Sequence, residues 1–262
     1  MKTSQPFLTV DKVSVKAANS QLLVSDVSCG LQAGNIMAII GANGAGKTSL
    51  LKAIAGDISY TGNIKIQGLA DTAKLRARQI AVLPQLSLLN FPYRVAEVVG
   101  LSRIPHNTGR IVDDNIVSDA LELMDISFLT NRLYTELSGG EKQRVQLARV
   151  LAQIWSEDDA PAKSRLLLLD EPTSALDLGH QQQLMNAIRK FAEQGVTVVM
   201  VLHDVNLAAH YADCILALQC SQRLAFGSVD DVITASNIKS LFAVDAQVIK
   251  HPKHQTPVVI GL

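Results

Sequence analysis

Short runs of apolar residues, separated by polar or glycine-rich turns, recur along the chain. Such runs lie at 36–40, 166–169, 196–202 and 214–218. Apolar runs of this length, bounded by turns, are typical of strands buried on both faces. Helical spacing at 47–55, which ends at Gly56, and at 181–194 places helices between such strands. This alternation predicts an α/β fold with a mixed or mainly parallel sheet covered by helices on both sides.

Two regions follow other patterns. Before residue 35, short strand patterns around Val13, Val15 and Val24 flank a polar turn at 18–20, which predicts an N-terminal antiparallel β part. Short strands are also predicted at 62–66 and 80–83. From about 86 to 150 the spacing is helical, at 95–101, 115–124 and 138–155. We therefore expect one domain over 1–262, with a core from about 1–85 and 151–262 and an inserted helical subdomain at about 86–150.

Composition and charge argue against several classes of protein. The 262 residues are 48% hydrophobic, and 24 basic side chains balance 24 acidic ones. This balance disfavours wholesale disorder and a nucleic-acid partner bound through overall charge. No apolar run approaches the roughly 20 residues of a membrane span, and the first residues lack a signal-peptide pattern. Three cysteines without a CxxC motif indicate reduced thiols. The polar segment 156–164 predicts a surface loop, whereas the mixed pattern after 222 predicts no particular element.

The segment GANGAGKT at 41–48 fits the phosphate-loop pattern GxxxxGK[ST] between a strand and a helix. Its backbone N–H groups and the positive helix end favour a polyphosphate. Lys47 would reach the β- and γ-phosphates, and the Thr48 hydroxyl would bind Mg²⁺. The residues expected to hold nucleotide here are Gly41, Ala42, Asn43, Gly44, Ala45, Gly46, Lys47, Thr48 and Ser49. The motif indicates a nucleoside triphosphate without choosing between a kinase, a motor and a switch.

Two carboxylates end the apolar strand at 166–169. Asp170 would hold Mg²⁺ through a water molecule, and Glu171 would orient or deprotonate an attacking water. From the strand pattern alone, it is equally possible that Asp170 and Glu171 are ordinary surface acids at the end of a strand. The segment LSGGEKQR at 137–144 opens a helix with Ser138 as the N-cap, which makes either a second anion site or an ordinary capped helix.

These motifs, in this order, resemble the ATP-binding-cassette (ABC) ATPases, whose signature is LSGGQ-like. The resemblance covers nearly the whole chain, with Glu141 in place of the commoner glutamine. It implies a P-loop NTPase fold, ATP and Mg²⁺ as ligands, and ATP hydrolysis. The implied catalytic residues are Glu171, His203 and Gln85, the further nucleotide contacts are Ser138, Gly139, Gly140 and Asp177, and the metal-binding residues are Thr48, Gln85 and Asp170. The family usually stacks adenine on an aromatic residue, but 15–18 contains none, so base contact is expected to be weak or supplied by another side chain.

The resemblance also implies partners. Family members pair head to tail with a second copy and sit on two transmembrane permease subunits at the cytoplasmic face of the inner membrane. A periplasmic binding protein delivers the cargo to these permease subunits. Phe91, Pro92, Tyr93 and 95–100 either meet the permease or pack internally. The segments 83–85, 97–99 and 103–106 and the insert at 156–164 resemble iron-chelate and cobalamin importers, and most of all the haemin-import ATPases of Gram-negative bacteria.

The sequence leaves other functions open. The cargo could instead be a ferric siderophore or cobalamin, and the chain could be a soluble ABC ATPase of DNA repair or translation. The short spacing from Gln85 to Leu137 leaves no room for the coiled-coil arm of that class, and a P-loop kinase would leave 137–141 and His203 unexplained. The remaining histidines are expected to be surface or core residues: His106, His180, His210, His251 and His254.

Overall fold

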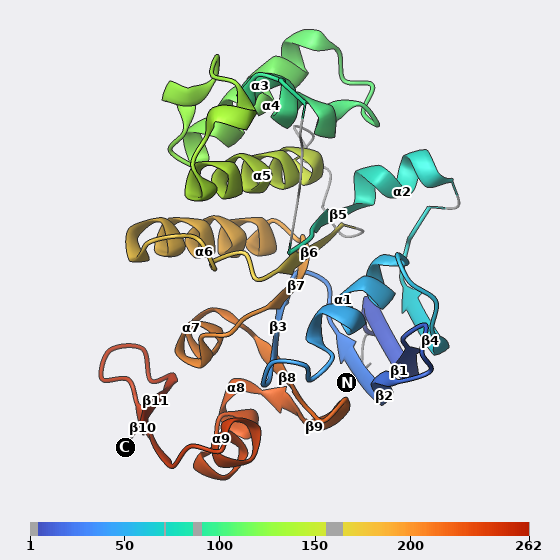
Figure 1. Cartoon of the computed structure of the whole chain (residues 1–262), viewed down its shortest axis with the longest axis vertical. Coiled ribbons are helices and arrows are strands. Elements are labelled where there is room, and N and C mark those ends of the chain that lie inside the picture. The colour runs from blue at the N-terminus through green and yellow to red at the C-terminus, as the bar shows by residue number, and fades with distance from the viewer. Residues whose placement is uncertain (1–4, 71, 86–90, 156–164, 262) are drawn as a thin grey trace.

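The computed structural model describes residues 5–70, 72–85, 91–155 and 165–261. A six-stranded sheet with the order β5-β6-β7-β3-β8-β9 lies at its centre (Figure 1). The strands are β3 (Ile36–Ile40), β5 (Ile80–Leu83), β6 (Leu166–Asp170), β7 (Thr197–Val201), β8 (Cys214–Gln219) and β9 (Gln222–Ser228). Neighbours are parallel except β8 and β9. The predicted mixed sheet is therefore confirmed, and the antiparallel strand forms one edge.

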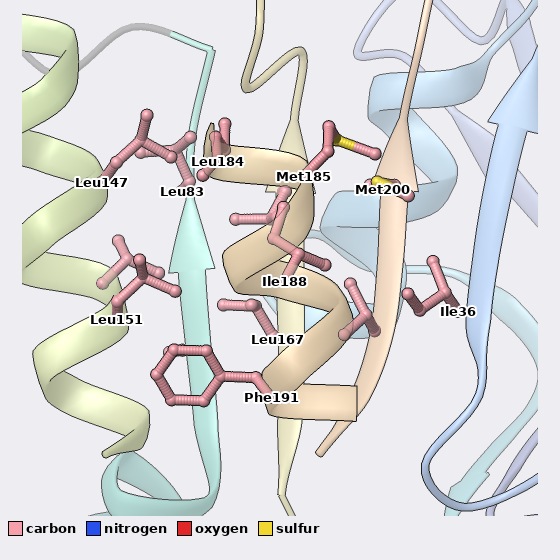
Figure 2. Packing of buried hydrophobic residues seen from close by; sticks show 14 of the residues in the cluster. Ile36, Leu83, Leu147, Leu151, Leu167, Leu184, Met185, Ile188, Phe191 and Met200 are labelled. Carbon is pink, nitrogen blue, oxygen red and sulfur yellow. The ribbon is translucent and has the colours of Figure 1, made fainter. Parts of the chain in front are cut away.

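Both faces of this sheet are covered. Along β3, Ile36, Ala38 and Ile40 belong to one apolar cluster, whereas Met37 and Ile39 belong to another, and all five are fully buried. Helices α5 (Gly139–Ile154) and α6 (Leu178–Glu193) pack in the first cluster, and α1 (Lys47–Ala55) packs in the second. Figure 2 shows α6 lying over the strands, with its apolar side chains directed toward them. Because side chains alternate along a strand, continuous apolar runs are what two covered faces require.

The N-terminal β part is an antiparallel sheet with the order β2-β1-β4, as predicted. Its strands are β1 (Leu8–Lys16), β2 (Leu22–Leu31) and β4 (Thr61–Ile66). The described residues between β5 and β6 form mainly helices, namely α3 (Val95–Gly100), α4 (Arg110–Leu123), α5 and three short 3₁₀ turns at 101–103, 127–129 and 134–136. Helix α4 begins five residues before the predicted position 115, because its largely exposed first turn has no apolar periodicity to mark it.

Several elements were not predicted from the sequence. These are β9, α2 (Ala73–Gln79), α7 (Val205–Tyr211), α8 (Val229–Val232), α9 (Ala235–Phe242) and the hairpin of β10 (Ala246–Lys250) and β11 (Pro257–Gly261). Helix α2 buries none of its residues, so it carries no apolar stripe to detect. The hairpin β10–β11 attaches to α7, where the Asn206 amide donates to the Val259 carbonyl oxygen (3.1 Å) and accepts from the Val259 N–H (2.7 Å). The predicted loop at 156–164 lies outside the described residues.

The three cysteines are free thiols in contrasting surroundings. Burial raises the pKa of Cys29 and of Cys214 to about 12. Cys220 is exposed in the two-residue turn between β8 and β9, where it and Ser221 have φ values of 46° and 66°. Positive φ at both positions is the geometry of a type I′ hairpin turn. Among the described residues, no helix is both long and apolar enough to cross a membrane.

Candidate active site

The loop at 41–46 is shaped by close backbone contacts. A Cβ atom at Gly41 would lie 2.2 Å from the carbonyl oxygen of Leu218, and one at Gly46 would lie 2.2 Å from that of Leu23. Gly46 has a φ of 98° and is the N-cap of α1, so this loop turns directly from β3 into the helix. Only glycine fits at these two positions without displacing a strand. Helix α1 runs from Lys47 to Ala55 and ends at Gly56, which confirms the predicted bounds.

Lys47 is buried within this loop. Its Nζ donates hydrogen bonds to the carbonyl oxygens of Gly41 (2.8 Å) and Ala42 (3.0 Å). Burial lowers the pKa of Lys47, while the nearby carboxylates of Glu171 and Asp170 act in the opposite direction. Both acceptors are uncharged, so these bonds hold the ammonium group in place without neutralising it. A cation kept in this way at a helix N-terminus suits a polyphosphate.

Two oxygen donors meet beside this lysine. The Thr48 hydroxyl donates to Oδ1 of Asp170 at 3.1 Å, and Asp170 ends β6 almost fully buried. Burial raises the pKa of Asp170, with a further rise from Glu171, while the hydrogen bond from Thr48 and the charges of Lys52 and Lys47 lower it. Hydroxyl and carboxylate oxygens are the donors that Mg²⁺ prefers, so this pair fits the expected metal.

Glu171 stands at the centre of three segments that are far apart in the sequence. Its Oε1 lies 2.6 Å from Nε2 of His203, which follows β7, and accepts a hydrogen bond of 3.2 Å from Nε2 of Gln85, which follows β5. Because parallel strands end at one edge of the sheet, residues after β5, β6 and β7 converge there. Glu171 itself has a φ of 50°, a left-handed conformation that costs free energy in a non-glycine residue and clusters at functional sites.

Apart from Asp170, the side chains described above share a cavity of about 390 Å³. It is lined by Leu23, Asn43, Gly44, Gly46, Lys47, Thr48, Ser49, Gln85, Glu171 and His203. The structure therefore brings the phosphate loop together with all three predicted catalytic side chains. Leu23 is the one aliphatic side chain in this lining. Leu23 was not predicted as a site residue, because its strand pattern gave no sign that β2 passes beside Gly46.

The remaining predicted nucleotide contacts lie apart from this cavity. None of Ser138, Gly139, Gly140 and Asp177 is among the described residues that line it. Ser138 caps α5 as predicted, and Asp177 caps α6. A capping box within the chain closes the N-terminus of α5, because the Glu141 carboxylate accepts hydrogen bonds from the Ser138 hydroxyl (2.7 Å) and the Ser138 N–H (2.8 Å). These bonds lower the pKa of Glu141.

The apolar segment after Gln85 divides into two parts. Val95, Val98 and Val99 are fully buried in the main core, so the alternative that 95–100 packs internally is correct for them, and the expectation that they form a contact surface is wrong. Phe91 and Tyr93 instead remain 62% and 42% exposed, with ring centroids 6.1 Å apart. The buried valines follow the helical period of α3, whereas the two aromatic residues precede the helix and lie outside the core.

The other histidines lie outside the cavity lining. His106 is half-buried, and desolvation together with Arg103 lowers its pKa to about 4. The ring of His254 stacks on that of His251, with centroids 4.9 Å apart, and meets the ring of His210 edge-on, with centroids 5.0 Å apart. No group of three or more histidine, cysteine or acidic side chains suited to a metal occurs within the described ranges. His180 contacts Asp177, which the sequence analysis did not anticipate.

The sequence of the chain is similar to those of known proteins over most of its length. Residues 24–174 match a family model described as ABC transporter. The hemin import ATP-binding protein HmuV of Pseudomonas entomophila (strain L48) is 44% identical over 257 residues, which span 97% of this chain and 99% of that protein. HmuV of Plesiomonas shigelloides is 44% identical over 243 residues, or 88% and 93% of the two chains. HmuV of Gloeobacter violaceus is 46% identical over 256 residues, or 95% and 92%.

Solved structures agree on the fold. A chain from a transporter assigned to the metal-chelate ABC type, solved in an inward-facing conformation, superposes with a TM-score of 0.79 and 28% identity, covering 99% of this chain and 98% of that one. An ATP-binding subunit of an ABC transporter superposes with a TM-score of 0.74 at 24% identity, covering 86% and 91%. Similarity over nearly the full length of both chains accounts for the sheet, the phosphate loop and the helical part together.

Proposed function

The chain belongs to the ABC transporter family of ATPases, and we propose that it is the ATP-hydrolysing subunit of a bacterial importer of haemin. The observation that carries the cargo assignment is the similarity, over 88% or more of this chain, to hemin import ATP-binding proteins from three bacteria. The chain's own residues account for the nucleotide chemistry. The residues that line the cavity suit a nucleotide, and we propose that other subunits handle the cargo.

The phosphate loop holds the triphosphate. The N–H groups at the start of α1 and the ammonium of Lys47 face the β- and γ-phosphates, where they offset the negative charge. Mg²⁺, when bound, screens the charge of the phosphate oxygens, and we assign it to Thr48 and Asp170 with Gln85 close by. These residues act mainly by positioning and electrostatics, which is the main source of rate in phosphoryl transfer.

Glu171 is our candidate for the group that accepts a proton from the attacking water. His203 and Gln85 both contact its Oε1, and we assign the water to Oε2. The side chain is 17% exposed, so solvent competes little with these contacts. His203, which is 45% exposed, is free enough to turn toward a γ-phosphate once a nucleotide binds. His203 would then leave Oε1 of Glu171 when a nucleotide binds and return to it when the site is empty.

Asp170→Asn tests the metal assignment. The raised pKa means that folding disfavours the charged carboxylate, so a neutral amide should raise the thermal midpoint of the nucleotide-free protein. The same variant should weaken apparent Mg²⁺ affinity about 10- to 100-fold, the range seen when a group supporting a bound metal is lost. Thermal melts and Mg²⁺ titrations of ATPase rate measure both effects. Unchanged Mg²⁺ dependence would contradict the assignment.

Leu23 is our candidate for the contact with the nucleotide base. It supplies the aliphatic surface in the cavity, and the region at 15–18 provides no aromatic ring. An aliphatic contact does not distinguish purines by their hydrogen-bonding edges, so we expect ATP and GTP to bind within about tenfold of each other, a gap of roughly 1.4 kcal/mol. Competition titrations measure the ratio. A preference for ATP well beyond this range would mean that another group reads the base.

A second copy of the chain would complete the site. We propose a head-to-tail pair in which the α5 N-terminus and Asp177 of one copy meet the triphosphate held by the other. The positions of Ser138, Gly139 and Gly140 outside the cavity lining of their own chain support this arrangement. Closure would add N–H donors to the γ-phosphate and exclude water, and hydrolysis would remove the ligand that joins the copies.

The helical part is our candidate for the contact with the permease. Phe91 and Tyr93 are exposed beside Gln85 in the sequence, and Ile104 is 71% exposed at an open cavity of about 840 Å³ between α3 and α4. Exposed apolar side chains of this kind are typical of protein–protein contact surfaces. We propose that two permease subunits dock here, which would place the chain at the cytoplasmic face of the inner membrane. A periplasmic binding protein would supply the cargo.

Affinity purification from detergent-solubilised membranes tests this function. Recovery of a polytopic permease supports a transport subunit, whereas recovery of only ribosomes or DNA ends would support a soluble ABC ATPase of translation or repair. A deletion strain then tests the cargo. Loss of growth with haemin as the iron source, and retained growth with ferric siderophores, supports haemin. Loss on a siderophore, or loss of cobalamin uptake, would assign the chain to that alternative importer.

A further inference from the structure

A row of contacts joins the first turns of α5 to the start of α6. Asp177 Oδ1 accepts hydrogen bonds from the backbone N–H of His180 (2.9 Å) and from its ring nitrogen Nδ1 (2.8 Å). On the other side of the ring, Nε2 lies 2.8 Å from Nη1 of Arg144 on α5. The same Nη1 donates to the carbonyl oxygen of Asp125 at 3.1 Å. The His180 side chain is 28% exposed, so the ring lies largely enclosed between the two helices.

These partners define the chemical state of the ring. A guanidinium group can only donate hydrogen bonds, and a carboxylate can only accept them. Nε2 of His180 must therefore be the unprotonated acceptor for Arg144, and Nδ1 must carry the proton given to Asp177. The Asp125 carboxylate lies 3.9 Å from Nε2, beyond hydrogen-bond distance. The neutral ring thus connects a cation on α5 with an anion at the start of α6.

Two further contacts tie the same surfaces together. A Cβ atom at Gly140 would lie 3.2 Å from the carbonyl oxygen of Ala175, so α5 packs closely on the segment before α6. The Gln143 amide lies within 3.5 Å of the Pro172 carbonyl oxygen. With Arg144 and His180, these contacts cover the first two turns of α5. The residues that we expect to face the nucleotide of the partner copy, at the ends of α5 and α6, are therefore linked within one chain.

We propose that His180 is a positioning residue for ATP hydrolysis, which fixes Asp177 relative to the N-terminus of α5. The two helix ends then present Asp177 and Ser138 to the opposite nucleotide as one rigid surface. This inference rests on the head-to-tail pair proposed above. His180 lies outside the cavity lining, so its effect is on the geometry of the closed pair and not on the binding of ATP to the phosphate loop.

His180→Ala removes both side-chain contacts. We expect kcat to fall about threefold to thirtyfold, the range for residues that couple two sites, while ATP affinity of the isolated subunit stays within about twofold. His180→Gln, which can keep one polar contact, should recover part of kcat. His254→Ala is the matched control, since His254 is exposed in the C-terminal part. Steady-state rates, ATP titrations and thermal midpoints are measured for each variant.

A double-mutant cycle separates positioning from a general structural role. If His180 acts through Arg144, the variant His180→Ala/Arg144→Ala should lose no more kcat than the more severe single variant. Losses that multiply, a wild-type kcat in His180→Ala, or a loss matched by a fall in ATP affinity would each overturn the proposal. Glu171→Gln is assayed beside them. If Glu171→Gln also retains the wild-type turnover, the proposed catalytic role of Glu171 has failed. If it is inactive while His180→Ala is normal, only the positioning role of His180 is wrong.

Discussion

Glu171→Gln is expected to abolish nearly all ATP turnover while leaving nucleotide bound. The substitution keeps the size of the side chain, and an amide oxygen can still accept the contacts that His203 and Gln85 make with Oε1. What it removes is the capacity to take a proton from water. Loss of a general base costs on the order of 10²–10⁴-fold, so steady-state hydrolysis should fall by about that factor while ATP affinity changes little.

The same variant should trap the closed pair. If ATP joins two copies and hydrolysis separates them, a chain that binds but does not hydrolyse should accumulate as a dimer with Mg²⁺ and ATP, and light scattering should show its mass doubling. Glu193→Gln, at the exposed last residue of α6, is the matched control and should behave as wild type. A wild-type hydrolysis rate in Glu171→Gln would show that another group activates the water.

Lys47→Ala is expected to eliminate ATP binding without unfolding the chain. The ammonium group would contribute two or more charge-assisted hydrogen bonds to phosphate oxygens, each contributing about 1.5–3 kcal/mol. Their loss predicts an affinity decrease of at least about 10²-fold. The cost to folding should be small, because burial already lowers the pKa of Lys47 and its present acceptors, on Gly41 and Ala42, are uncharged.

Calorimetric titration with ATP measures this loss, and a thermal melt measures folding. The control is Lys65→Ala, which removes an exposed lysine of β4 outside the cavity lining. Unchanged ATP affinity in Lys47→Ala would contradict the assignment of the loop to phosphate. Loss of affinity together with a collapse of the thermal midpoint would show instead that the two hydrogen bonds of Lys47 hold the loop itself.

Much of the fold follows from local sequence patterns. The bounds of α1 and β5 match the prediction because glycine or proline marks their ends, and the central strands were found because burial on both faces makes them continuously apolar. Helix α2 and the first turn of α4 were missed because they bury little apolar surface. For these elements, polar caps such as Thr72 were the available signal.

The candidate site was predictable in its members and less so in their contacts. The order of the motifs predicted Gln85, Glu171 and His203 as a group. In the structure, Gln85 and His203 both contact Oε1 of Glu171. The valines of α3 show where the local pattern misled, since an apolar stripe cannot say whether it faces a partner or the core. His180 was overlooked because its importance depends on Arg144, which lies 36 positions away.

The hairpin turn between β8 and β9 offers a practical route to watching the two copies meet. Cys220 is exposed there, and the turn is tied to β2 by the hydrogen bond from the Ser25 N–H to the Ser221 carbonyl oxygen (2.7 Å). The thiols of Cys29 and Cys214, with pKa values of about 12, stay protonated and unreactive at neutral pH. A maleimide dye or spin label added to the unaltered chain would therefore attach at one rigid point, and energy transfer between labelled copies would report opening and closing in real time.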